Sequence, residues 1–137
     1  MERNRWRKTN NMKFYPIIDK VYRKNFHLIV NEDPKKFYEW ICKHHKKAKE
    51  DSKLKEMILD CKGICIWCFN PYFYVFIPKF NWRIEDQACL THELNHFVDF
   101  VFQETGIPTD IDNTEVRAYY FEYIFSECWT ALKPKRK

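Results

Sequence analysis

Residues 64–77 read ICIWCFNPYFYVFI and decide the fold of this chain. Two runs rich in β-branched and aromatic residues, Ile64–Phe69 and Tyr72–Ile77, stand on either side of Asn70-Pro71. Such runs favour strands, and a short connection of turn-forming residues joins strands into a hairpin. The stretch therefore predicts a β-hairpin that ends at Pro78, because proline cannot donate to a strand ladder.

A long helix is predicted directly after this hairpin, from about Glu85 to Thr105. Apolar residues recur there at intervals of three and four, as on one face of an α-helix. Gly106 and Pro108 then form a helix stop signal.

Further signals lie on both sides of this segment. Phe26–Val30 is an apolar run that predicts a strand. Asp33-Pro34 predicts a helix start, with Asp as N-cap and Pro at the first helical position. This helix is expected to continue to about Lys49, and the polar stretch 46–55 is expected to be a solvated helix end or loop. A last helix is predicted from about Asp112 to Leu132.

The predicted order of strand, helix, hairpin, helix and helix defines an α+β fold with its helices against one face of a mostly antiparallel sheet. A chain of 137 residues with 45% hydrophobic residues fits one domain with a real core. We expect a basic N-terminal tail at 1–13, the domain at 14–132 and a basic C-terminal tail at 133–137.

The net charge of +5 is unevenly distributed along the chain. Residues 1–13 and 133–137 together sum to +8, and the remaining 119 residues sum to −3. A uniformly basic domain would indicate a nucleic-acid surface, whereas basic ends on an acidic body are more typical of solvated tails. Contact between these tails and nucleic acid stays open as the minor alternative.

Several classes of protein are disfavoured. Only 2 glycines occur, and neither lies in a phosphate-binding loop motif. No uninterrupted apolar run reaches the roughly 18 residues of a membrane span, and the basic N-terminus lacks the apolar segment of a signal peptide. We therefore expect a cytoplasmic protein without a membrane partner, whose six cysteines are thiols.

The predicted long helix contains His92-Glu93-Leu94-Asn95-His96, an HExxH motif. Positions i and i+4 lie one turn apart on the same helix face, so His92 and His96 can share one metal ion. Glu93 lies about 100° round the helix, where its carboxylate can take a proton from an activated water. The motif indicates a zinc site with Glu93 as the general base.

The two sides of this helix differ in polarity. One side carries the apolar residues Leu90, Leu94, Phe97, Val98 and Val101, and the other carries the polar residues His92, His96, Asp99 and Gln103. We expect the apolar side to pack on the core and the histidines to face a cleft. The alternative is an exposed polar face that happens to hold two histidines.

Catalytic zinc has three protein ligands, so a third is needed. A histidine ten residues after His92 is excluded because position 102 is Phe102. We expect the ligand to be Glu115, returned by a helical hairpin to the level of the histidines. The alternative role for Glu115 is a capping box with Asp112, and Asp99 is the rival ligand.

Four further side chains are candidates around the site. Asp99 and Glu122 are candidates to orient a ligand in the second coordination shell. Tyr119 and Tyr123 are candidates to stabilise an oxyanion, the alternative for each being aromatic packing in the core.

HELNH, a Gly-containing turn and then the glutamate of DNTEVRAYYFEYIF resemble the gluzincin class of zinc metallopeptidases. More closely, residues 64–132 resemble small metallopeptidase-like proteins of tailed bacteriophages, in which a β-hairpin precedes the HExxH helix and an E-x-x-AY helix follows. The resemblance implies a zincin-like domain with His92, His96 and Glu115 as zinc ligands and Glu93 as the base. For a phage protein, the expected compartment is the host cytoplasm.

We expect a zinc-dependent metallohydrolase, of peptidase type, that acts on a peptide or protein substrate. Zn²⁺ would activate a water, and Glu93 would pass the proton of that water to the leaving amine. Tyr72–Ile77 is the strand expected to pair with an extended substrate. The alternative is a non-catalytic phage structural or binding protein with a structural or vestigial zinc, whose basic tails contact nucleic acid or protein.

Overall fold

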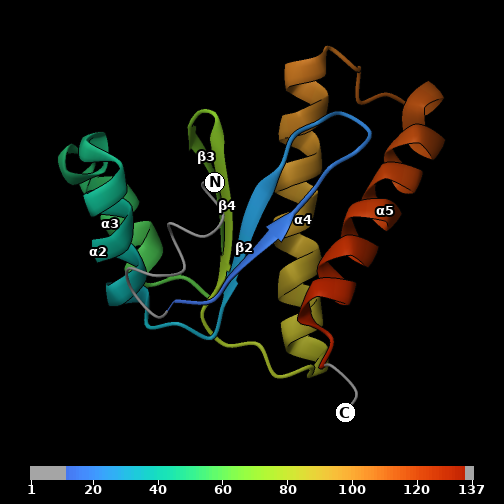
Figure 1. Ribbon diagram of the computed structural model, residues 1–137. Helices are drawn as coiled ribbons and strands as arrows, with labels where there is room; N and C mark the ends of the chain where they lie inside the picture. Colours follow the sequence, from blue (N-terminus) through green and yellow to red (C-terminus); the bar gives the residue numbers. More distant parts are fainter. Residues whose placement is uncertain (1–11, 135–137) are drawn as a thin grey trace.

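The computed structural model describes residues 12–134. It confirms the α+β class (Figure 1). The elements are, in chain order, β1 (Phe14–Ile17), β2 (Phe26–Val30), α2 (Pro34–His44), the 3-10 turn η1 (Lys46–Glu50), α3 (Ser52–Leu59), β3 (Ile64–Phe69), β4 (Tyr72–Ile77), α4 (Ile84–Thr105), the 3-10 turn η2 (Ile111–Asn113) and α5 (Thr114–Leu132).

The four strands form one sheet in the order β1-β2-β4-β3. The β3–β4 hairpin pairs antiparallel as predicted, and so do β1 and β2. β2 and β4, however, pair in parallel, with Leu28 opposite Val75. The sheet is therefore mixed, with two antiparallel pairings and one parallel pairing, because the crossover through α2, η1 and α3 returns the chain beside β2 in the same direction.

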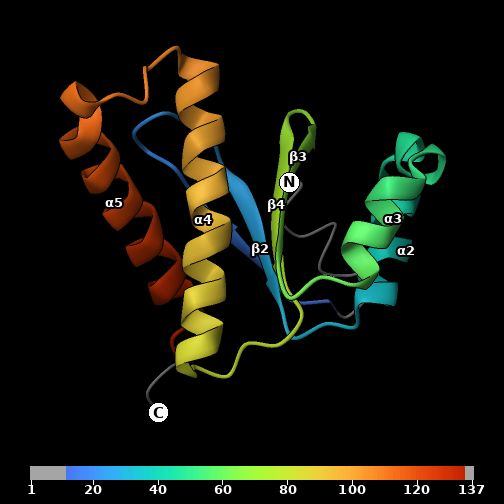
Figure 2. The same cartoon turned by 180° about the vertical axis from the view of Figure 1, so that it is seen from behind.

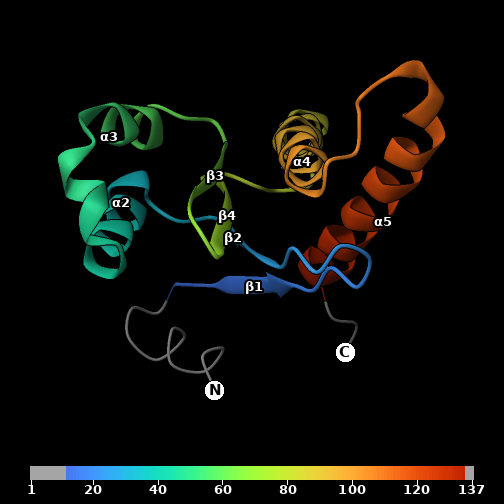
Figure 3. The ribbon, with the colours of Figure 1, turned by 90° about the horizontal axis from the view of Figure 1, so that it is seen from above.

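Helices cover both faces of the sheet, so the prediction of helices on one face is wrong. α2 and α3 lie on one side, and α4 and α5 lie on the other (Figures 1 and 3). Alternate side chains of β4 serve the two cores: Val75 packs with α4 and α5, and Phe76 packs with α2. A nearly continuous apolar strand such as β4 is typical of a sheet buried on both faces.

Local signals fix the ends of the helices. The Asp33 side chain accepts a hydrogen bond from the backbone N–H of Lys35, which confirms the predicted cap of α2. Gly106 ends α4 with φ 74°, a left-handed conformation that glycine adopts without a side-chain clash.

One α-helix, one strand and two 3-10 turns were not predicted. Residues 46–55, expected to be a solvated helix end or loop, instead form η1 and the start of α3, and Leu54 is buried there. Asp51 caps α3 by accepting from the backbone N–H of Leu54. β1 was missed as well; it contains Pro16, which is compatible with its position at the edge of the sheet.

The loop between β1 and β2 is organised by one buried carboxylate. Asp19 is 2% exposed and accepts hydrogen bonds from the backbone N–H groups of Val21, Tyr22 and Lys24. The Tyr120 hydroxyl of α5 donates to the same carboxylate over 2.7 Å. This loop is thereby attached to the outer helix.

The predicted basic tails lie largely outside the described residues. Of the expected tail 1–13, only Met12 and Lys13 are described, and Met12 is buried in the core beside α2. Of the tail 133–137, only Lys133 and Pro134 are described. No helix within residues 12–134 combines the length and the apolar character needed to cross a membrane.

Candidate metal centre

The HExxH motif lies in the middle of α4, and the helix has the two-sided character that the sequence predicts. Its apolar residues Leu90, Leu94, Phe97, Val98 and Val101 are fully buried. His92 and His96 are exposed on the opposite side. α4 stands between α5 and the β3–β4 hairpin, so this exposed side is flanked by both (Figure 2).

The two imidazole rings converge. Nε2 of His92 and Nε2 of His96 are 3.2 Å apart, and the ring planes are nearly perpendicular, at 80°. In a tetrahedral zinc site with Zn–N bonds of about 2.0–2.1 Å, two ligand nitrogens lie about 3.3 Å apart. The spacing of the two nitrogens therefore fits two ligands of one zinc ion, and it also fits a hydrogen bond between the rings.

Glu93 lies beside the histidines but is buried, with 6% of its surface exposed. Its Oε1 is 3.8 Å from Nε2 of His92. Burial raises the pKa of Glu93, while the neighbouring His92 and His96 and a hydrogen bond from the Cys65 backbone lower it, so that the net shift is upward. A carboxyl group with a raised pKa is suited to accept and release a proton near neutral pH.

Gly63 allows the chain to cross closely over Glu93, and sequence analysis did not identify this role. A Cβ atom at Gly63 would lie 2.6 Å from Sγ of Cys89 and 3.1 Å from Cγ of Glu93. Any larger residue would therefore displace the start of β3 or the carboxylate. The available signal was the rarity of glycine, since this is one of only 2 in the chain.

Three thiols surround the Glu93 carboxylate. The Cys89 thiol donates to the carbonyl oxygen of Lys62, and Cys61 donates to the carbonyl oxygen of Ile58. Burial and the charge of Glu93 raise the pKa of Cys61 to about 11 and also raise that of Cys65. These groups are therefore neutral S–H groups at neutral pH, as expected for free cysteines.

β3 runs alongside α4 in the same direction. Lys62 contacts Cys89, the Cys65 backbone contacts Glu93, and the Trp67 ring stacks on Phe100 with centroids 5.6 Å apart. β3 is an edge strand, whereas β4 is paired on both sides, with β2 and β3. The expectation that Tyr72–Ile77 pairs with an extended substrate is therefore wrong, because that strand has no free edge.

Two hollows lie along this junction of β3 and α4. One of about 460 Å³ is bordered by Cys61, Lys62 and Cys89, at the start of β3. The other, of about 270 Å³, is bordered by Trp67 and Phe100 near the end of β3. The contact between Glu93 and Cys65 lies between the two hollows. Along the chain, Cys65 falls between Lys62 and Trp67, and Glu93 falls between Cys89 and Phe100.

Glu115 is not brought to the histidines. It is exposed in the first turn of α5, and Arg117 is the residue of that turn that contacts α4. Positions two apart on a helix differ by about 200°, so Glu115 points away from α4. The capping box with Asp112 is not formed either: the N-cap of α5 is Asn113, and the Asp112 backbone N–H donates to Asp110.

Asp99 pairs with α5 instead of orienting a histidine. Arg117 Nη2 lies 2.6 Å from Asp99 Oδ1, and the same guanidinium donates to the side chain and the backbone carbonyl of Asn95. Asn95 is the fourth residue of the motif, so this contact joins the HExxH turn to α5. Arg117 was not singled out from the sequence.

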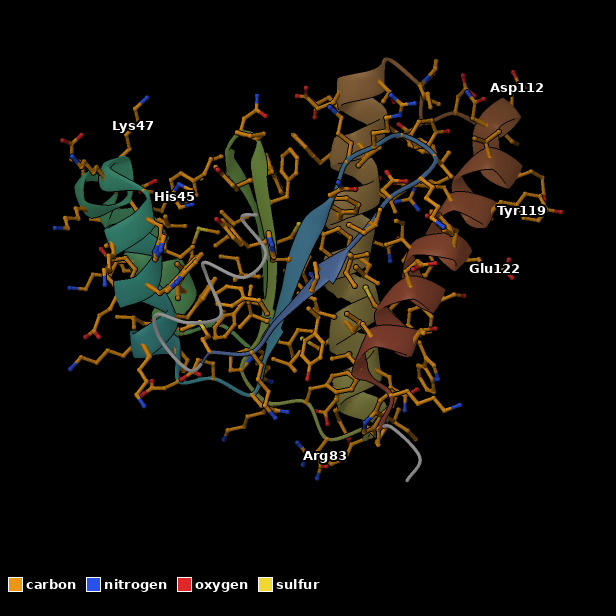
Figure 4. The ribbon with its side chains drawn as sticks, viewed as in Figure 1. His45, Lys47, Arg83, Asp112, Tyr119 and Glu122 are labelled. Atoms are coloured by element: carbon orange, nitrogen blue, oxygen red, sulfur yellow. The ribbon has the colours of Figure 1, made fainter. Side chains whose placement is uncertain are left out.

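The remaining candidates lie away from the histidines. Tyr119 and Glu122 are exposed on the side of α5 that faces away from α4 (Figure 4). The Tyr123 hydroxyl donates to the carbonyl oxygen of Ile18 and accepts from the backbone N–H of Lys20. Its hydroxyl therefore holds the β1–β2 loop to α5.

Residues 12–134 thus bring together some of the predicted site residues but not all of them. His92, His96 and Glu93 lie together, as local helix geometry requires. Within residues 12–134, no group of three or more His, Cys, Asp or Glu side chains is close enough to hold one metal ion. Comparison with family models, curated proteins and solved structures finds no match to this chain.

Proposed function

We propose that the protein is a zinc-dependent hydrolase of peptidase type, with a zincin-like arrangement of an edge strand beside an HExxH helix. The observation that carries the proposal is the convergence of two exposed imidazole nitrogens, 3.2 Å apart, next to one buried carboxylate. A zinc peptidase requires this combination of ligands open to substrate and a sheltered base.

His92 and His96 would hold the zinc ion through Nε2. When bound, zinc supplies a Lewis acid that polarises a carbonyl oxygen and lowers the pKa of water. Glu93 accepts the proton of the attacking water and delivers it to the leaving nitrogen. The burial of Glu93 and the close passage of Gly63 restrict the carboxylate to this position for both transfers.

We propose Glu115 as the third ligand. No hydrogen bond or ion pair ties its carboxylate to another residue within 12–134, and Asn113 provides no side-chain cap for the turn that contains it. Bringing Glu115 to the histidines requires this turn of α5 to rotate about the helix axis, which breaks the contacts of Arg117 with Asp99 and Asn95. Asp99 is the less favoured ligand because Arg117 already neutralises its carboxylate.

The substrate in this proposal is an extended peptide. The outer edge of β3 is not paired with another strand of the described sheet. The start of this strand lies beside Glu93 of the motif. Unpaired edge groups bind an extended chain by strand addition. The backbone of the peptide would then lie between β3 and the two histidines.

The Glu93→Gln variant tests this proposal, because it keeps the shape of the side chain and removes the base. We expect the zinc content of wild type and a loss of at least about 100-fold in the rate of cleavage of fluorescently labelled casein. The matched control is Glu127→Gln, at an exposed position of α5. Equal rates in wild type and Glu93→Gln, or no cleavage by the zinc-loaded wild type, would contradict a peptidase.

A further inference from the structure

A hollow of about 460 Å³ lies at the end of the sheet where β2 and β4 finish and β3 begins. This volume falls within the roughly 300–1,000 Å³ of pockets that hold a small molecule. The hollow is bordered by Pro34 at the start of α2, Pro78 after β4, and Arg83 and Cys89 at the start of α4. Figure 4 labels Arg83 at this end of the molecule. The pocket is therefore built from segments that lie far apart in the chain.

The strand order explains why a pocket forms at this end of the sheet. β2 and β4 are parallel neighbours, and Val30 pairs with Ile77 where the two strands end. The chain leaves β2 for α2 on one face of the sheet and leaves β4 for α4 on the other face (Figures 1 and 3). Two connections that diverge from neighbouring strand ends leave a crevice between them. Open α/β sheets bind their ligands at such a topological switch point.

Hydrogen bonds hold the walls of this crevice in place. The Asn31 side chain, just after β2, donates to the carbonyl oxygen of Phe80 over 3.0 Å and accepts from the backbone N–H of Phe80 over 2.7 Å. The Asp86 carboxylate accepts from the backbone N–H groups of Asn81 and Arg83. The loop between β4 and α4 is thus tied both to the end of β2 and to the first turn of α4.

The interior of the pocket is mainly apolar. Pro34 and Pro78 contribute rings that carry no backbone N–H donor, and Cys61 and Cys89 contribute thiols. Burial raises the pKa of Cys61 to about 11 and also raises that of Cys89, so both thiols are neutral at neutral pH. Covering such a surface with an apolar group is favourable by about 25 cal/mol per Å². The pocket is therefore suited to the apolar body of a ligand.

The rim of the pocket carries positive charge that is not neutralised. Its cations are Lys62, Lys79 and Arg83, and its carboxylates are Glu85 and Asp86. Arg83 is paired with Asp86 over 3.3 Å. Within residues 12–134, no carboxylate lies within ion-pair distance of Lys62 or Lys79, and both side chains are exposed. Two ammonium groups against the one remaining carboxylate complement an anionic group on a ligand.

We propose that this pocket binds a small organic anion, a molecule with an apolar body and one acidic group such as a carboxylate. The body lies against the prolines and thiols, and the acidic group pairs with Lys62 and Lys79 at the rim. His92 and His96 do not border this pocket. The inference therefore goes beyond the proposed peptidase and does not depend on zinc.

The test uses two fluorescent probes that differ by one charge. Anilinonaphthalene sulfonate has an apolar body and one anionic group, and phenylnaphthylamine has the same body without the sulfonate. Both gain fluorescence in an apolar site, so titration of the full-length protein with each probe gives a dissociation constant. We expect the sulfonate to bind at least about tenfold more tightly, because its contact with the lysines adds to the burial of the shared body.

Removal of the two lysine charges locates the site. The double variant Lys62→Gln, Lys79→Gln is expected to bind the sulfonate about tenfold more weakly and the neutral probe as tightly as wild type does. The matched control is Lys47→Gln, Lys53→Gln, at exposed positions of η1 and α3 that do not border the pocket. It should keep the wild-type affinity for both probes. Equal affinities of wild type for the two probes, or an equal loss of sulfonate binding in the two double variants, would overturn the proposal.

Discussion

Glu93 and His92 are neighbours in the chain, yet the carboxylate is buried and the imidazole is exposed. The helix turns by about 100° per residue, which directs Glu93 under β3 and His92 toward solvent. The pKa of Glu93 is raised mainly by this burial. The two imidazoles proposed as metal ligands are therefore accessible, and the carboxylate proposed as the base is held in a low-dielectric environment.

Asp19 is the residue on which the β1–β2 loop depends. Its carboxylate accepts hydrogen bonds from three backbone N–H groups and from the hydroxyl of Tyr120, which is 101 residues further along the chain. Sequence alone offers no signal for this role, because an aspartate in a loop is ordinary and its long-range partner is set by tertiary packing.

Asp19→Ala is expected to lower the free energy of unfolding by roughly 2–4 kcal/mol, since it leaves three partly buried backbone N–H groups and the Tyr120 hydroxyl without their acceptor. Tyr120→Phe removes a single donor and should cost about 1 kcal/mol. Urea denaturation followed by circular dichroism measures both. A smaller loss for Asp19→Ala than for Tyr120→Phe would mean that the backbone contacts of Asp19 contribute little.

Elements with strong local signals could be predicted from the sequence, and elements that depend on distant partners could not. The hairpin, the cap of α2 and the length of α4 follow from residues within a few positions of each element. α3 was missed because its buried Leu54 and Ile58 are separated by charged residues in a Lys-rich stretch. β1 is short and contains a proline, and it becomes a strand by pairing with β2.

In the candidate site, too, some features follow from local sequence and others depend on distant contacts. His92, Glu93 and His96 belong to a single turn of one helix, so their proximity follows from helix geometry. The position of Glu115 depends on how α5 is rotated about its own axis, and the contact of Arg117 with Asp99 and Asn95 sets that rotation. No feature within the sequence of α5 itself specifies that contact.

Substitutions on α4 and α5 can identify the third zinc ligand. Glu115→Gln replaces an anionic donor with a neutral amide, and we expect it to weaken zinc binding by more than about 100-fold. Asp99→Asn should weaken binding by about tenfold or less, because Asp99 is paired with Arg117. Competition with a chromogenic chelator measures both affinities.

Asp112→Ala serves as the control for this pair of variants, because Asp112 is exposed and its side chain caps no helix. Its zinc affinity should equal that of wild type. Should Asp99→Asn prove more damaging than Glu115→Gln, the third ligand lies on α4 itself.

In the whole molecule, the sheet separates two cores, and the candidate site lies at one edge of it. α4 buries one side against the sheet and α5, and its histidines lie on the exposed side next to β3, which is the edge strand of the sheet formed by residues 12–134. The strand order could not be read from the sequence, since β2 and β4 are neighbours in the sheet although α2, η1 and α3 separate them in the chain. That order places β3, and not β4, at the edge of the sheet formed by the described residues.

Zinc binding by the two histidines is measured directly by mass spectrometry of the metal content. After dialysis against buffer with trace zinc, wild type is expected to hold about one zinc ion per chain. The double variant His92→Ala, His96→Ala is expected to hold none, while His44→Gln, on α2, keeps the wild-type content. Stoichiometric zinc retained by the double variant would contradict the assignment of the metal to this helix.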